Sequence, residues 1–278
     1  MISFPAIAVL GAGSMGGAIL SGLLMPDVQV SGGIWTTNRS PAGAALVPVH
    51  PNITAMDTQT EPEANKIAVR HASIVILAVK PYMIHDLVGE IYFDLRPDAI
   101  VVSVAVGIHL AVLEKLLPES VVALRAMPNT PAAIKMGVTG LSRGRRASAA
   151  QFELIKKVFQ TVGVVVPVEE SMIDVLSSIS GSGPAYFYFL VEQLTHSAVA
   201  KGFTREEAAV LVNGTFIGAA NLLAQTGQSP AELRRQVTSP KGTTEQAIAV
   251  LAEARLEELF ARATAAAVTR ANEIASGG

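Results

Sequence analysis

The sequence predicts an α/β protein, with a doubly wound parallel sheet in its N-terminal part and an all-α C-terminal part. Three observations support this fold class. Short apolar, β-branched segments alternate with helical segments up to about residue 168, which is typical of βαβ units. Beyond this position, alanine-rich segments with apolar residues at helical spacing continue to the end of the chain. A glycine-rich loop follows the first apolar segment, where a helix is expected to begin.

The chain is long enough for two domains, because 278 residues compare with roughly 150 residues per domain. We place the boundary at the change in composition, which gives a sheet domain over residues 1–168 and a helical domain over residues 169–278. The absence of cysteine excludes a disulfide scaffold and a thiolate metal site. The net charge of -2 argues against nucleic-acid binding. We therefore expect small molecules or further copies of the chain as partners.

The expected strands are continuous apolar runs, as is typical of strands that are buried on both faces. They cover residues 6–10, 33–37, 74–79, 100–104, 121–126 and 164–167. Helices expected among these strands include residues 14–24 and 148–159. In the C-terminal part, apolar spacing predicts helices over residues 174–180, 185–201, 205–225, 230–238, 244–254 and 257–274.

Two charge-free segments need a test against a membrane span, because half of the residues are hydrophobic and only 16% are charged. Residues 99–113 are shorter than the about 20 residues of a transmembrane helix, and predict a buried strand and a turn. Residues 208–231 carry Gly214 and Gly218 at a spacing that resembles a membrane-helix packing pattern. Asparagines and glutamines, however, interrupt the apolar sequence of this segment. We interpret this segment as a helix buried between subunits. The first ten residues lack the basic start of a signal peptide, so we expect no membrane partner and a cytoplasmic location.

The glycine-rich loop points to a Rossmann-type dinucleotide-binding domain. Its sequence is Gly11-Ala12-Gly13-Ser14-Met15-Gly16. In such a loop the first glycine allows a tight turn, the second lets the backbone approach a pyrophosphate, and the third lets the helix pack on the strand. The motif alone is weak evidence, but the preceding strand and following helix agree with it. We therefore expect Gly11, Gly13, Ser14 and Met15 to bind a dinucleotide.

The end of the second expected strand indicates which dinucleotide is bound. A site selective for NAD places an acidic residue about 20 residues after the loop, on the ribose 2′-hydroxyl. This chain has Thr36-Thr37-Asn38-Arg39-Ser40 there instead, and the cation and hydroxyls of this segment, above all Asn38, Arg39 and Ser40, suit a 2′-phosphate. We predict that the cofactor is NADP, with NADPH preferred over NADH. The alternative is a solvated turn with an incidental arginine.

Other loops at strand ends are candidates for the same cofactor, because open parallel sheets bind ligands at the carboxyl ends of their strands. The candidate residues are Ala78, Val79, Lys80, Pro81, Ala105 and Asn129. A solvated side chain explains Lys80 equally well, and a stiff connection between two prolines is the alternative for the loop around Asn129. The five histidines have no metal-ligand spacing, so we predict no metal site.

Two loops rich in small residues precede helices in the C-terminal part, over residues 180–186 and 238–244. Backbone N–H groups and hydroxyls at a helix start form a site suited to a carboxylate. The alternative for each is a loop with a helix cap.

These segments together resemble the pyrroline-5-carboxylate reductase family, over essentially the whole chain. The shared segments are residues 11–18, 78–81, 127–131, 180–186 and 237–244. The resemblance implies reduction of the cyclic imine of pyrroline-5-carboxylate to L-proline by hydride transfer from NAD(P)H, the last step of proline biosynthesis. It also implies a homodimer built through the helical domain, with dimers often assembling into a decamer.

The resemblance further implies roles for the last shared segment. Its backbone amides would hold the substrate carboxylate, and the residues concerned are Ser239, Gly242, Thr243 and Thr244. The hydroxyl of Thr244 would lie near the imine nitrogen, which makes Thr244 the candidate catalytic residue, while the proton donor stays open. Lys241 is a departure, because the family usually has a small residue there, often glycine. If φ is positive at this position, a lysine costs about 1 kcal/mol or more; otherwise its side chain points to solvent or adds a cation near the carboxylate.

Two alternatives stay open. One is another NADP-dependent two-domain dehydrogenase, acting on a small keto or hydroxy acid with a catalytic lysine in the helical part. Lys201 is the only lysine between residues 168 and 240, and nothing around it looks catalytic. The other is a non-catalytic NADP sensor, which would not need loops suited to a carboxylate.

Overall fold

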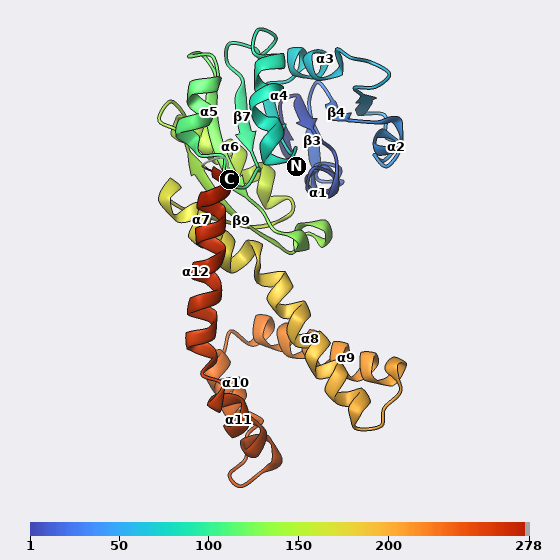
Figure 1. The fold of residues 1–278 in the computed structure, drawn as a ribbon. Helices are drawn as coiled ribbons and strands as arrows, with labels where there is room; N and C mark the ends of the chain where they lie inside the picture. The colour runs from blue at the N-terminus through green and yellow to red at the C-terminus, as the bar shows by residue number, and fades with distance from the viewer. Residues whose placement is uncertain (276–278) are drawn as a thin grey trace. The chain divides into compact units, whose positions relative to one another are not determined.

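The computed structural model describes residues 1–275 and divides them into two compact units. The sheet unit contains Met1–Ser182 together with residues 267–275, and the helical unit contains Gly183–Ala266. Figure 1 shows the sheet and its covering helices in colours from blue to yellow, and the helices of the second unit in yellow-orange to red. The predicted combination of a doubly wound sheet domain and an all-α part is confirmed.

The sheet unit is built on an eight-stranded sheet with the order β10-β9-β8-β7-β6-β2-β4-β5. Its strands are β2 (Ile7–Leu10), β4 (Ile34–Asn38), β5 (Ile53–Asp57), β6 (Ile74–Leu77), β7 (Ile100–Ser103), β8 (Val122–Met127), β9 (Gly137–Arg143) and β10 (Gly163–Pro167). All neighbours are parallel except β8 and β9. Strands β5-β4-β2-β6-β7-β8 follow the 3-2-1-4-5-6 order of dinucleotide-binding folds, so the order reverses between β2 and β6.

Helices cover both faces of this sheet. They are α1 (Ser14–Leu23), α2 (Pro41–Ala44), α3 (Ala64–His71), α4 (Ile84–Ile91), α5 (Leu110–Leu116), α6 (Ala149–Gln160) and α7 (Ile173–Leu176). Alternate residues of β2 enter two cores, because successive side chains of a strand point to opposite faces. Ile7 and Val9 belong to the core of α1 and α6, whereas Ala8 and Leu10 belong to the core of α3, α4 and α5. This burial on both faces explains the continuous apolar runs in the sequence.

Short helical turns complete the sheet unit at the edge where the parallel strands end. They are η1 (Pro81–Met83), η2 (Thr130–Ile134), η3 (Glu170–Met172) and the π-helical turn η4 (Ser177–Gly181). The last residues of α12 (Leu256–Ala275) also belong to this unit. A Cβ atom at Gly107 would lie 3.0 Å from Cγ2 of Ile274, so the loop after β7 and the end of α12 are in close contact.

The helical unit contains α8 (Gly183–Ala200), α9 (Arg205–Thr226), α10 (Pro230–Gln236), α11 (Thr243–Glu253) and the first part of α12. Capping boxes start α9 at Thr204 and α10 at Ser229, and Gly227 ends α9 in the left-handed conformation. The rings of Phe187 and Phe216 join α8 to α9 at a centroid distance of 5.4 Å.

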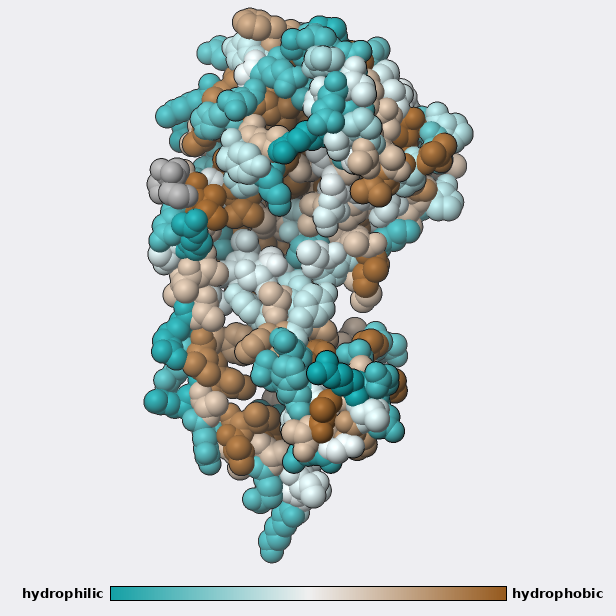
Figure 2. All heavy atoms as spheres, turned by 45° about the vertical axis from the view of Figure 1, so that its right-hand side comes forward, coloured by the Kyte–Doolittle hydropathy of each residue, from teal (hydrophilic) through white to brown (hydrophobic). Residues whose placement is uncertain are grey.

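Many apolar side chains of the helical unit are exposed in the single chain, and Figure 2 shows such brown side chains between teal ones on this unit. Val210 is 75% exposed and Ile217 is 59% exposed, both on α9. This helix alone among the described residues is long and apolar enough to cross a membrane by length and composition, with a mean hydropathy of 1.3. Only 11% of its most apolar window is buried within the chain, so α9 lacks the cover that a core helix has.

Four strands were not expected from the sequence. They are β1 (Ile2–Phe4), β3 (Val28–Val30), β5 and β9. β5 lies at the sheet edge with half-exposed residues, and β9 contains two glycines and runs antiparallel to β8, so neither has the continuous apolar pattern of a central parallel strand. The segment expected as one helix over 174–180 is α7 followed by the π-helical turn η4.

The change in composition near residue 168 and the division into compact units differ in position. Residues 169–182 belong to the sheet unit, because η3 and α7 are joined to β8 by ion pairs of Arg125. The limits 1–168 and 169–278, which we drew from composition, stay a prediction about the domains. The compact units, which are defined by contacts, divide after Ser182 instead.

Candidate dinucleotide and substrate site

The three glycines of the motif have three different environments. Gly11 has a positive φ of 94°, and a Cβ there would lie 2.9 Å from the backbone of Ala78. A Cβ at Gly16 would lie 2.5 Å from the carbonyl oxygen of Gly11, so only glycine lets α1 start this close to β2. At Gly13 a Cβ would meet no atom within 4 Å. These environments agree with the roles expected for a turn, close packing and the approach of a ligand.

The start of α1 is suited to an anion. Its N-cap residue is Gly13, and no side chain caps the first turn. The first intrahelical bond is donated by the N–H of Gly17 to the carbonyl of Gly13, so the N–H groups of Ser14 and Met15 precede the helical hydrogen bonds. These N–H groups and the positive end of the helix dipole, beside the open space at Gly13, fit the pyrophosphate of a dinucleotide.

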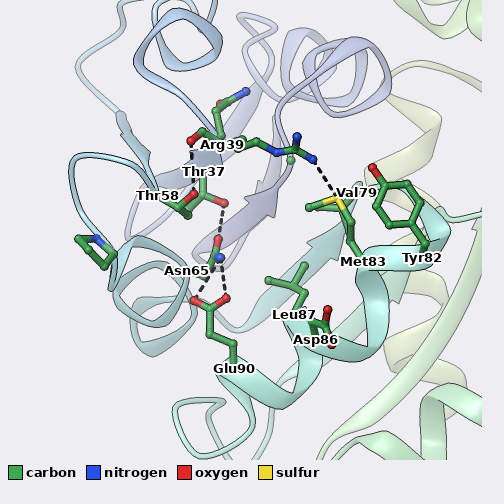
Figure 3. Close-up of a pocket in the computed structure, with 13 residues that line it drawn as sticks. Thr37, Arg39, Thr58, Asn65, Val79, Tyr82, Met83, Asp86, Leu87 and Glu90 are labelled. Carbon is green, nitrogen blue, oxygen red and sulfur yellow. Dashed lines mark hydrogen bonds between the residues drawn. The ribbon is translucent and has the colours of Figure 1, made fainter.

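A cavity of about 460 Å³ lies beside the motif at the carboxyl ends of β2, β4 and β6, and we call it the Arg39 cavity (Figure 3). Of the residues predicted to bind the cofactor, Gly11, Asn38, Arg39 and Val79 line it. Thr37, from the same strand end as Asn38 and Arg39, also lines it. The other lining residues were not predicted: Thr58, Pro62, Asn65, Tyr82, Met83, Asp86, Leu87 and Glu90. Three segments that are separate in the sequence, all predicted to bind the cofactor, thus meet at one cavity.

A chain of hydrogen bonds joins three secondary-structure elements along one side of the Arg39 cavity (Figure 3). The hydroxyl of Thr37 on β4 donates to Oδ1 of Asn65 on α3 at 2.7 Å. The amide nitrogen of Asn65 donates to both carboxylate oxygens of Glu90 on α4, at 3.2 and 3.1 Å. Asn65 therefore orients the carboxylate of Glu90 and ties both helices to β4, the strand that ends just before Arg39.

Other predicted cofactor residues lie near this cavity without lining it. Ser40 caps α2, where its hydroxyl oxygen accepts from the N–H of Gly43 at 3.3 Å. The hydroxyl proton stays available, because a serine can accept and donate at once. Ala78 packs against Gly11, and Lys80 is exposed next to Pro81 at the start of η1.

A second cavity of about 400 Å³ lies at the carboxyl ends of β7 and β8, and we call it the Asn129 cavity. Met15 and Asn129 are the predicted cofactor residues that line it, whereas Ala105 is buried and does not. The π-helical turn contributes Ser177, Ser178 and Gly181, and the end of α12 contributes Ala267, Arg270, Ala271 and Ile274. All of these residues belong to the sheet unit. π-helical turns often occur at functional sites.

Asn129 itself has a structural task. Its Oδ1 accepts from the N–H of Val138 at 2.8 Å, and its Nδ2 donates to the carbonyl of Ser180 at 3.0 Å. The side chain thus ties the loop after β8 to β9 and to the π-helical turn. One N–H of the amide is left for a ligand, because the amide nitrogen has two hydrogens.

A buried ionic cluster stands beside the Asn129 cavity and was missed in the sequence. Arg125 on β8 is fully buried, and its guanidinium donates to Asp174 at 2.7 Å and to Glu170 at 3.0 Å. Nδ1 of His109 lies 3.3 Å from the same guanidinium. Removing one partner of such a buried pair costs about 3–5 kcal/mol. The signal in the sequence was a lone charged residue inside an apolar strand.

The loop predicted to bind a carboxylate lies in the helical unit, before α11. The N–H of Gly242 donates to the carbonyl of Ser239 at 3.0 Å, so this N–H is already used within the loop. The first intrahelical donor is Gln246, which leaves the N–H groups of Thr243 and Thr244 before the helical hydrogen bonds. Thr244 is half-buried, and Gly242 caps the helix without a side chain. Of the four predicted residues, Thr243 and Thr244 thus have the N–H groups that best suit a carboxylate.

Comparisons with known proteins agree with this arrangement. Residues 6–107 match the family described as NADP oxidoreductase coenzyme F420-dependent, and residues 170–274 match the family described as pyrroline-5-carboxylate reductase dimerisation. The fold and the site therefore define an NADP-dependent oxidoreductase with a helical part that forms oligomers.

Similarity over the whole chain defines the family. Pyrroline-5-carboxylate reductase of Pseudomonas aeruginosa is 36% identical over 99% of this chain and 98% of its own length. The enzyme of Corynebacterium melassecola is 36% identical over 96% of this chain and 98% of its own. The solved structure of a pyrroline-5-carboxylate reductase from Coxiella burnetii is 37% identical with a TM-score of 0.84, and covers 96% of this chain and 97% of its own. The chain belongs to the pyrroline-5-carboxylate reductase family.

A more distant structure shares the fold. Plasmodium falciparum pyrroline carboxylate reductase, solved with NADP bound, is 22% identical and has a TM-score of 0.82 over 97% of this chain and 98% of its own. Within residues 1–275, no group of three or more histidine, aspartate or glutamate side chains is placed to hold a metal ion.

Proposed function

We propose that the chain reduces pyrroline-5-carboxylate to L-proline, the last step of proline biosynthesis, and that it prefers NADPH over NADH. The observation that carries this proposal is full-length identity of 36% to proteins named as this reductase. The open start of α1 and the exposed Arg39 in its cavity support the choice of cofactor. The reaction adds a hydride to the carbon of the C=N bond and a proton to its nitrogen.

The sheet unit would hold the cofactor through residues at the strand ends. A reduced nicotinamide dinucleotide, when bound, supplies the hydride. The N–H groups of Ser14 and Met15 hold its pyrophosphate, and Arg39 with Ser40 binds the 2′-phosphate. The Asn129 cavity, with Met15 on its wall, is the place that we assign to the reacting end, because it lies at the ends of β7 and β8.

The helical unit would hold the substrate. The N–H groups of Thr243 and Thr244 bind the substrate carboxylate at the start of α11, with Ser239 and Gly242 shaping the loop. The hydroxyl of Thr244 is directed at the imine nitrogen and holds it for protonation. Orientation by these groups lowers the barrier, since a correctly positioned pair of reactants avoids much of the entropic cost of meeting.

We also propose that the enzyme is a cytoplasmic homodimer, and that dimers assemble further into a decamer. The match of residues 170–274 to a dimerisation family supports association. The exposed apolar residues of α9 give a physical reason, because a helix that is apolar on all sides needs cover from another element. Size-exclusion chromatography with light scattering tests both steps of this assembly.

The test of the proposed activity is NADPH consumption with pyrroline-5-carboxylate, compared with small keto acids as substrates. Turnover of the cyclic imine at least about 100-fold faster than any keto acid is expected, because the carboxylate and the imine are recognised together. Turnover of a keto acid instead would favour another two-domain dehydrogenase. Binding of NADPH without any turnover would favour a nucleotide sensor.

A further inference from the structure

Lys241 adopts a backbone conformation that lysine rarely takes. Its φ is 59°, in the left-handed region. Lys135 and Arg255 are the other non-glycine residues of the described chain with positive φ, and both close the end of a helical segment, where this conformation is common. Lys241 instead precedes a helix. Its strain therefore needs a different explanation.

The strain belongs to a tight turn over Ser239, Pro240, Lys241 and Gly242. The carbonyl of the first residue accepts from the N–H of the fourth at 3.0 Å. Proline in second place and a positive φ in third place are the features of a type II turn, which favours glycine or asparagine in third place. A Cβ at Gly242 would lie 2.5 Å from Oγ of Ser239, so the turn is closed tightly. This turn delivers the chain into α11 and sets the direction of its first N–H groups.

A carboxylate holds the strained residue in place. Oε2 of Glu245 accepts from the backbone N–H of Lys241 at 2.8 Å. Glu245 is the third residue of α11, a position from which glutamate usually reaches back to the N-cap residue. Glu207 and Glu232 make that usual contact, each at 2.9 Å to the N–H of the N-cap residue. At α11 the contact has moved one residue earlier, from the cap to the residue with positive φ.

We propose that Glu245 is a positioning residue for the substrate: its carboxylate keeps Lys241 in the left-handed conformation, and so fixes the turn that presents the N–H groups of Thr243 and Thr244 to the substrate carboxylate. This inference rests on the proposed function. A hydrogen bond to an ionised acceptor is stronger than a neutral one, which suits the task of holding a disfavoured conformer. Without it, lysine at this position favours other conformations and the anion site is formed for only part of the time.

The experiment compares steady-state kinetics of Glu245→Ala, Glu245→Gln, Lys241→Gly and the double variant Lys241→Gly/Glu245→Ala. Glu245→Ala should raise KM for pyrroline-5-carboxylate about 5- to 10-fold and leave KM for NADPH within about 2-fold, because only the carboxylate site loosens. Glu245→Gln keeps a neutral acceptor, so its KM for the imine should rise less than that of Glu245→Ala. The double variant should recover most of the loss, since glycine adopts a positive φ without strain.

Glu232→Ala is the matched control, because it removes a similar contact at the start of α10 and leaves the turn intact. It should change neither KM, although its melting temperature should fall about as much as that of Glu245→Ala. An unchanged KM for the imine in Glu245→Ala would overturn the proposal. The proposal would also be overturned if Glu245→Ala raised KM for the imine equally with lysine and with glycine at position 241. Glu245 would then act independently of the strain at this position. A parent protein that does not reduce the imine at all would instead refute the proposed function.

Discussion

The side chains of Arg39 and Met83 meet across the Arg39 cavity, with Nη2 of the guanidinium 3.7 Å from the sulfur (Figure 3). Arg39 follows β4 and Met83 precedes α4, so this contact joins the two sides of the cavity. A contact to a thioether is weak, and Arg39 is exposed. The guanidinium can therefore leave Met83 for a phosphate at little cost, and we propose Arg39 as the cation that distinguishes NADPH from NADH.

We predict that Arg39→Asp reverses the cofactor preference. The parent loses a charged hydrogen bond worth about 1.5–3 kcal/mol when NADH replaces NADPH, which is roughly 10- to 150-fold in affinity. In the variant the carboxylate repels the 2′-phosphate and accepts from the ribose hydroxyl of NADH instead. The measurement is kcat/KM for both cofactors in both proteins. Equal values in the parent would contradict the assignment.

Gly16 and Gly17 give a matched pair of substitutions in α1. A Cβ at Gly16 would lie 2.5 Å from the backbone oxygen of Gly11, whereas one at Gly17 would meet no atom within 4 Å. Gly16→Ala should displace the glycine-rich loop and weaken NADPH binding about 10-fold or more. Gly17→Ala should bind NADPH normally and gain about 0.5–1 kcal/mol of stability, because alanine favours helix. Fluorescence titration and urea unfolding check both; equal NADPH affinity in the two variants would refute the role of Gly16.

The sequence predicts the sheet better than the site, for a physical reason. Ile7–Leu10 and Ile74–Leu77 are apolar on both faces, so pattern alone identifies them as central parallel strands. β9 lacks this pattern, because its glycines and polar residues pair antiparallel with β8. Only local motifs at strand ends could be assigned to the cofactor from the sequence, and Arg39, which lines the cavity, belongs to such a motif.

The missed residues depend on contacts between distant segments. Asn65 and Glu90 line the cavity from two helices, and no local pattern marks either side chain as facing it. The positive φ of Lys241 was likewise not predictable. In the sequence Pro240-Lys241-Gly242, the residue with positive φ could equally have been the glycine. The structure places the positive φ at Lys241, and the hydrogen bond to Glu245 compensates for the strain there.

Gly218→Leu should weaken dimer formation. Within the single chain, a Cβ at Gly218 would meet no atom within 4 Å, so a larger side chain does not disturb the fold of one subunit. We expect a close helix crossing between subunits at this glycine, and leucine would separate the helices. Gly89→Leu, on an exposed position of α4 with equal space, is the control. Sedimentation velocity at micromolar concentration should show a dimer for the parent and the control, and normal assembly of Gly218→Leu would place the crossing elsewhere.

Asp57 should make stability depend on pH. Its carboxylate accepts from the hydroxyl of Thr60 at 2.7 Å and from the N–H groups of Gln59 and Thr60, and the hydroxyl contact is the main reason that its pKa lies below its usual value. Because the folded pKa is lowered, the stabilisation is complete above about pH 4 and is lost as pH falls through the folded pKa. Asp57→Ala should be less stable than the parent at pH 7, with the difference narrowing in acid. Urea unfolding at several pH values checks this; a difference that is constant with pH would exclude the carboxylate as its cause.

Thr244 should act through its hydroxyl. Thr244→Ala should lower kcat/KM for pyrroline-5-carboxylate through the loss of a hydrogen bond worth about 1–3 kcal/mol, with NADPH binding nearly unchanged. Thr244→Ser keeps the hydroxyl and should retain more activity. Unfolding curves of both variants are needed, because altering the first turn of α11 affects stability as well. If alanine and serine behave alike, the hydroxyl has no role and the proton comes from water or another group.

Hydride transfer to the imine is tested most directly with NADPH that carries deuterium at both C4 positions of the nicotinamide, by following the label into the product made from pyrroline-5-carboxylate. We expect L-proline with a single deuterium at the carbon that carried the C=N bond, detected by mass spectrometry and NMR, with one NADPH oxidised per proline formed. Oxidation of NADPH without labelled proline, or no oxidation at all in the presence of the imine, would contradict this expectation.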